Sequence, residues 1–144
     1  MTRQFPLAGL LRLRHLREDQ AAGSLALANE KLRTSRARTE GVSEVLDTTD
    51  LDPSGSASLH AVAAARASAR SMLADLQALE VELRSEQDRA QDRYRAARAE
   101  TVGLEKLEER HRDTEATAMI GAEQLVLDEL PTTGAGRRSG EARP

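Results

Sequence analysis

The stretch Thr48-Thr49-Asp50-Leu51-Asp52-Pro53-Ser54-Gly55-Ser56 decides the fold, because it is the one internal break in a chain made largely of helix-forming residues. Pro53 disfavours a helical backbone at Asp52, and the surrounding Ser, Gly and Asp residues favour a turn. The chain is therefore expected to reverse direction near residues 48–57.

Helical patterns without proline lie on both sides of this break. The first runs from about residue 7 to 47 and the second from about 57 to 130, where Pro131 stops it. We expect Ser56 or Ser58 to cap the second helix by accepting a free backbone N–H. From residue 131 to 144 the Pro, Thr, Gly, Arg and Ser residues cannot bury a core, which predicts a disordered tail.

The composition favours long helices over a compact enzyme. Of the 144 residues, 31% are charged and 39% hydrophobic, with one Phe, one Tyr and no Trp. Ala, Leu, Glu and Arg are strong helix formers that can bury a narrow stripe, whereas a compact core relies on aromatic and β-branched residues. The absence of Cys excludes disulfides and zinc–thiolate sites. A net charge of −3 argues against a general nucleic-acid binder.

Apolar and small residues recur at alternating steps of three and four, which is the spacing of a coiled-coil seam. Arg66, Glu80, Gln87, Glu108 and Glu115 interrupt it. A helical bundle is less favoured, because two helices cannot enclose a bundle core. We therefore predict an all-α fold, with a long antiparallel two-helix coiled-coil hairpin over residues 1–130. The seam residues are Leu25, Ala28, Leu32, Ser35, Thr39, Val42 and Leu46 in the first helix, and Val62, Ala69, Leu76, Leu83, Ala90, Ala97, Leu104, His111, Ala118 and Leu125, with Leu59, Leu73, Tyr94 and Ala122, in the second.

A reversal at residue 52 or 53 predicts that facing residues have numbers adding to about 105. Apolar residues then face apolar residues along the first helix. The facing pairs include Leu46 with Leu59, Val42 with Val62, Leu32 with Leu73, Ala28 with Leu76, and Leu11 with Tyr94.

In this register the second helix extends past the first from about residue 99 to 130. This overhang carries exposed apolar side chains, among them Leu104, Leu107 and Leu125. Gly103 and Gly121 lower its helicity by roughly 1 kcal/mol each relative to Ala. Because isolated helices draw most of their stability from packing, we expect the overhang to bind another protein.

Residues that could carry chemistry are few. Glu108 and His111 form a Glu-x-x-His pair, the spacing of a di-metal carboxylate site, but neither His15 nor His60 supplies the second copy that such a site needs. We favour His111 as a polar residue on the seam. A two-helix hairpin also offers no dry cleft for paired acid–base groups. We predict no catalytic residue, no metal site and no cofactor.

The first 17 residues contain four Arg and no acidic residue, threaded among Leu side chains. This pattern suits a transit peptide, a membrane-surface helix, or the start of a long helix that docks on an acidic protein. The uninterrupted helical pattern that follows favours the last. No apolar run approaches the roughly 18 residues of a transmembrane helix.

Several features, taken in order, resemble the flagellar export protein FliJ family. They are Phe5-Pro6-Leu7-Ala8-Gly9-Leu10-Leu11-Arg12-Leu13-Arg14, a long helix, a short polar turn, a longer helix with Leu104-Glu105-Lys106-Leu107-Glu108-Glu109-Arg110, and the closing Leu127-Asp128-Glu129-Leu130. The resemblance covers about residues 5–130. It implies a non-enzymatic component of the flagellar type III export apparatus, in the cytoplasm and peripheral to the inner face of the membrane through its partners.

The implied partners are the hexameric export ATPase, the cytoplasmic domain of the large export-gate membrane protein, and export chaperones. The resemblance suggests that the helix surface just after the turn, with Met72, Leu73, Leu76 and Leu79, contacts the gate. Leu73 and Leu76 are needed for the seam, so Met72 and Leu79 remain as the candidates. Carried onto this sequence, the resemblance assigns Arg12, Arg14, Arg17 and the overhang residues Leu104, Leu107 and Leu125 to the ATPase, and Met72 and Leu79 to the gate.

Two other functions are compatible with the same pattern. The chain could be a structural coiled-coil adaptor or a rotor-stalk-like subunit of another machine, because heptads do not name a partner. A basic-arm binder of nucleic acid or lipid would instead depend on residues 1–17.

Overall fold

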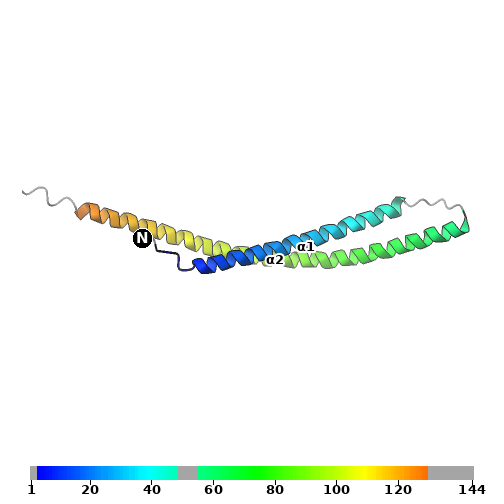
Figure 1. The fold of residues 1–144 in the computed structure, drawn as a ribbon, viewed down its shortest axis with the longest axis horizontal. Helices are drawn as coiled ribbons and strands as arrows, with labels where there is room; N and C mark the ends of the chain where they lie inside the picture. Colours follow the sequence, from blue (N-terminus) through cyan, green and yellow to red (C-terminus); the bar gives the residue numbers. More distant parts are fainter. Residues whose placement is uncertain (1–2, 49–54, 130–144) are drawn as a thin grey trace, which may run out of the picture. The chain divides into compact units, whose positions relative to one another are not determined.

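A computed structural model describes residues 3–48 and 55–129, and in this part of the chain it contains two helices and no strand. Helix α1 spans Ala8–Thr48 and helix α2 spans Ser56–Glu129 (Figure 1). The predicted all-α class and the helix boundaries are confirmed to within one residue. The predicted turn residues 49–54 and the predicted tail 131–144 lie outside the described residues.

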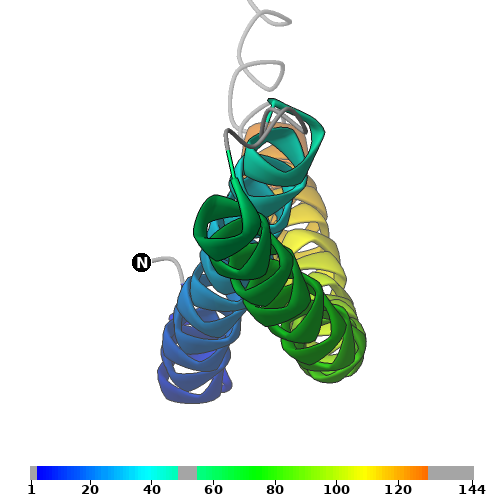
Figure 2. The same ribbon diagram turned by 90° about the vertical axis from the view of Figure 1, so that its right-hand side faces the viewer.

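The chain divides into two units. The hairpin unit is residues 13–101, and the end unit combines the residues up to 12 with those from 102 onward. In the hairpin unit, α1 and α2 lie side by side and run antiparallel (Figures 1 and 2).

Helix α2 begins differently from the prediction. Gly55 precedes it with a φ of 135°, a conformation that residues with a Cβ rarely adopt. The Gly55 carbonyl accepts the Leu59 N–H at 3.1 Å and the Ser58 hydroxyl at 3.0 Å. Ser56 is already helical, and Ser58 donates a hydrogen bond where the prediction had it accept one. Gly55 therefore starts the helix through its backbone.

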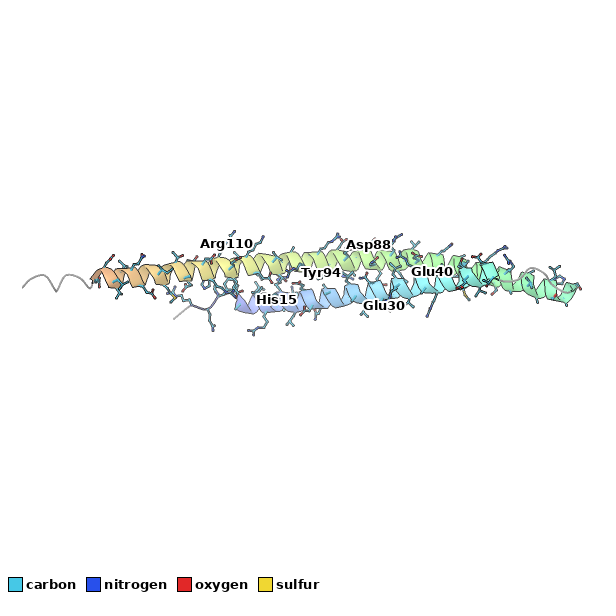
Figure 3. All side chains as sticks on the ribbon, turned by 90° about the horizontal axis from the view of Figure 1, so that it is seen from above. His15, Glu30, Glu40, Asp88, Tyr94 and Arg110 are labelled. Carbon is cyan, nitrogen blue, oxygen red and sulfur yellow. The ribbon has the colours of Figure 1, made fainter. Side chains whose placement is uncertain are left out.

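The predicted seam is confirmed through the hairpin unit except at Leu59, which is exposed. The half-buried and buried positions of both helices alternate in steps of three and four, and Tyr94 lies between the helices (Figure 3). Asp88, by contrast, lies on the outer side of α2. In this unit the seam positions are 14, 18, 21, 25, 28, 32, 35, 39, 42 and 46 on α1, and 62, 66, 69, 73, 76, 80, 83, 87, 90, 94, 97 and 101 on α2.

The core along this seam is thin and partly polar. In the hairpin unit the buried apolar side chains are Ala28, Leu32 and Ala90. Ser35 is buried beside them, and its hydroxyl makes no hydrogen bond to a described atom. Thr101 is fully buried and donates to the carbonyl of Ala97 at 3.1 Å. Because large apolar contacts are few, polar contacts at the edges of the seam contribute to helix pairing.

The predicted register is wrong by about ten residues. Side-chain contacts between the two helices join residues whose numbers add to between 114 and 117, the long Arg66 side chain reaches the Leu46 carbonyl at a sum of 112, and seam positions pair one to one at 115. Leu46 therefore lies opposite Ala69, while Leu59 is 55% exposed. The prediction matched apolar residues and left charge out. The contacts are Arg14 with Glu100, Glu18 with Arg98 at 3.3 Å, Asn29 with Gln87 at 2.6 Å, Lys31 with Glu86 at 2.9 Å, and Arg36 with Glu80 at 2.8 Å.

In the end unit, the segment before α1 lies along α2. The Arg3 N–H donates to the Glu115 carboxylate at 3.4 Å, and the Arg3 carbonyl lies 3.1 Å from Nε2 of His111. The Phe5 ring packs on His111 with centroids 5.7 Å apart. Leu11 is buried. The N-terminal residues therefore cover α2 as far as Glu115.

This coverage corrects the predicted overhang. The exposed end of α2 begins near residue 116 instead of 99, because the register moves α1 about ten residues further along α2 and the segment before α1 covers α2 up to Glu115. Every residue from 116 to 129 is exposed. We call residues 116–129 the end segment.

Cysteine pairs distinguish the two registers, since the chain contains no Cys of its own. We expect Leu46→Cys with Ala69→Cys to cross-link within one chain on oxidation. Leu46→Cys with Leu59→Cys should not, because ten residues of helix separate the two targets by about 15 Å. Mass spectrometry of the oxidised monomers measures both yields. Efficient cross-linking of only the second pair would restore the register of 105.

Candidate functional site

An apolar groove runs along the hairpin unit between α1 and α2. Its wider part is a hollow of about 730 Å³ that is lined by Val45 and Met72, which are 60% and 51% exposed. A second hollow continues it past Arg38 toward Leu27 and Leu79. We call this surface the apolar groove. It is lined by Leu27, Glu30, Lys31, Thr34, Ser35, Arg38, Gly41, Val42 and Val45 of α1, and by Ala65, Ser68, Ala69, Met72, Leu76, Leu79 and Leu83 of α2.

The sequence produces this groove through a second stripe beside the seam. On α1 the stripe occupies positions 27, 31, 34, 38, 41 and 45, which again alternate in steps of four and three. Residues at this spacing share one face of a helix. The hollow arises because Gly41, Ala65 and Ser68 are small, so the neighbouring large side chains have nothing opposite them.

Both predicted gate residues, Met72 and Leu79, lie in this groove. Leu73 is half-buried on the seam, as the prediction required. The sequence analysis missed the α1 wall, above all Leu27 and Val45, which are 67% and 60% exposed. The repeat of steps four and three from residue 27 to 45 was the signal that could have found it.

The charged side chains that line the groove belong to α1 and are two basic residues, Lys31 and Arg38, and the acidic Glu30. Arg38 lines both hollows. Lys31 reaches across to Glu86, and its hydrogen bond and positive charge lower the pKa of the Glu86 carboxyl. The lowered pKa means that the contribution of this pair to stability is present above the ordinary pKa of Glu86 and is lost as the pH falls through the lowered one.

The predicted N-terminal basic residues fall into two groups. Arg12 and Arg17 are exposed. Arg14 is half-buried on the seam and forms an ion pair with Glu100. The structure therefore leaves Arg12 and Arg17 on the surface and places Arg14 in helix pairing.

The predicted overhang residues are separated in the same way. Leu104 is half-buried, whereas Leu107 and Leu125 are 44% and 68% exposed. Large apolar residues of the end segment are between 49% and 68% exposed, and its charged residues are all acidic. The exposed apolar residues are Met119, Ile120, Leu125, Val126 and Leu127, and the acidic ones are Glu123, Asp128 and Glu129.

His111, the predicted polar seam residue, is half-buried and contacts Phe5 and Arg3. Over residues 3–48 and 55–129 no group of three or more His, Asp or Glu side chains is placed to hold a metal ion. Neither described helix combines the length and apolar character needed to cross a membrane.

The paired helices, the open groove and the exposed apolar end define a class of helical-hairpin protein that offers surfaces for other proteins. Residues 3–140 match the family model described as Flagellar FliJ protein, so the chain belongs to the FliJ family. Membership makes it a component of the flagellar export apparatus. No curated protein and no solved structure matches the chain.

A substitution at Gly121 tests how stable the helix is in the end segment. A Cβ at this position meets no atom within 4 Å, so Gly121→Ala should add roughly 1 kcal/mol of helix stability without a clash. We expect about fivefold slower amide hydrogen exchange in residues 116–129. Gly23→Ala, equally unhindered but in the hairpin unit, serves as the control. Unchanged exchange in the end segment of Gly121→Ala would show that its helix is already fully stable.

Proposed function

We propose that this protein is a non-enzymatic, stalk-like component of the export apparatus that binds the export ATPase ring through its end unit and the export gate through its apolar groove. Family membership supports the setting. The observation that carries the assignment of surfaces is that exposed large apolar residues gather in the groove and in the end segment, in addition to Leu7, Leu10, Leu13 and Leu16 near the start of α1.

The end segment is the surface best suited to the ATPase. Its apolar side chains have no cover from residues 3–12, and helices of this kind gain most of their stability by packing on a partner. The exposed Arg12 and Arg17 add positive charge to the N-terminal part of α1. They contribute chiefly to the association rate and to its salt dependence. Arg14, which pairs with Glu100, is left out of the proposed contact.

Replacing Met119 and Leu125 by Ser tests the ATPase contact. Burying one such side chain stabilises a complex by about 1.5–3 kcal/mol, so the double variant should bind the purified export ATPase at least tenfold more weakly. The control is Thr117→Ser with Gln124→Ser, which changes polar residues of the same segment. Calorimetric titration measures both affinities. Equal binding by both variants would move the contact elsewhere.

The apolar groove is the surface best suited to the export gate. Its walls come from the two antiparallel helices. On α1 the groove extends over about 18 residues, which is long enough for a partner helix of roughly 27 Å. Such a helix would place its large side chains over Gly41 and Ala65 and contact Val45 and Met72. This mode of helix-in-groove recognition is common among protein partners.

Replacing Met72 by Glu tests the gate contact. A buried charge without a partner is costly, so binding of the cytoplasmic domain of the gate protein should fall at least tenfold. Val81→Glu is the matched control, because Val81 is 71% exposed on the same helix but lies outside the groove. Loss of binding in both variants, or in neither, would contradict the groove. A gate domain that fails to bind even the unmodified chain would favour an adaptor of another machine.

A further inference from the structure

Four ion pairs join the helices of the hairpin unit at one consistent offset. Their residues lie on the seam or directly beside it, and the residue numbers of each pair add to between 114 and 117. We call these pairs the ion-pair ladder. They are Arg14–Glu100, Glu18–Arg98, Lys31–Glu86 and Arg36–Glu80.

The apolar residues of the seam do not by themselves favour this register. At a sum of 115, two seam pairs of the hairpin unit join residues larger than Ala on both sides, with both members apolar. They are Leu32 with Leu83 and Val42 with Leu73. Sliding one helix by a heptad, to a sum of 108, keeps both seams in contact and gives three such pairs. These are Leu25 with Leu83, Leu32 with Leu76, and Leu46 with Val62.

The charged residues do favour the register of 115. In the register of 108, Lys31 would lie opposite Leu79, Arg36 opposite Leu73, and Arg14 opposite Arg93. In the register of 122, Lys31 would lie opposite Arg93 and Arg36 opposite Gln87. Both alternatives lose these ion pairs and bring two cations together. Charge pairs at the edges of a coiled coil set partner choice and orientation in this way.

The register matters because the apolar groove takes one wall from each helix. A slip of seven residues moves α1 along α2 by about 10 Å, so Val45 would leave Met72 and Arg38 would leave Leu79. We propose that the charged residues of the ion-pair ladder are positioning residues, which select the one register that assembles the apolar groove. The functional role of the groove in this proposal rests on the proposed gate contact. The selection of the register by the ion-pair ladder does not.

The test exchanges charges at two pairs that do not line the groove. Glu18→Arg with Arg36→Glu leaves the net charge unchanged, but Arg98 then faces a second arginine and Glu80 a second glutamate. Each protein also carries Leu46→Cys and one partner Cys, at Ala69 for the register of 115, Val62 for 108 or Leu76 for 122. We expect the yield of the Leu46–Ala69 cross-link to fall about tenfold, and a neighbouring cross-link to rise.

Adding Arg98→Glu and Glu80→Arg restores opposite charges in the original register. This compensated variant should regain the Leu46–Ala69 cross-link, even if the first variant loses its helical circular dichroism. The control exchanges a pair within α2, Asp92→Arg with Arg95→Asp, and should leave all yields unchanged. An unchanged Leu46–Ala69 yield in the first variant, or no recovery in the compensated one, would overturn the proposal.

Binding of the gate's cytoplasmic domain provides the second measurement. It should be lost with the Leu46–Ala69 cross-link and return in the compensated variant. Binding that persists in a slipped register would overturn the link between ladder and groove. If the gate domain binds none of these proteins, including the unmodified chain, the proposed function fails while the cross-links still decide the register.

Discussion

The pairing of α1 with α2 in a single register is the constraint on which the rest of the hairpin unit depends. Its buried apolar residues, Ala28, Leu32 and Ala90, are too few and too small to fix that register by shape. Contacts at the seam edges, such as Arg36 with Glu80, therefore carry much of the specificity. Each exposed pair contributes little to stability by itself. The registers of 108 and 122, however, both lose these pairs and bring two cations together.

The small size of the buried core explains where partners can bind. A chain that buries little of its own apolar surface leaves side chains such as Val45, Met72 and Leu125 exposed. In the hairpin unit they border a groove that exists because small residues stand beside the seam. In the end unit they occupy a helix that the N-terminal residues do not reach. The two surfaces differ in charge, since Arg38 lines the groove whereas the end segment is acidic.

In the end unit, the short segment before α1 reduces the length of α2 that is exposed. Arg3 and Phe5 contact Glu115 and His111, which covers α2 as far as Glu115. His111 thereby acts in packing and hydrogen bonding. Residues beyond this contact depend on helix propensity, which Gly121 lowers. Their exposure makes them the natural place for a partner to add stability.

The sequence by itself determined the helices, their seams and the fold class, because steps of three and four and the break at Pro53 are local signals. It also separated Leu73, on the seam, from Met72, beside it. Only the tertiary structure decided the register, which placed Leu46 against Ala69, took Arg14 into an ion pair and brought Val45 to the groove. The physical reason is that a heptad seam repeats every seven residues, so many registers bury similar apolar surface. The choice among them rests on charges far apart in the sequence.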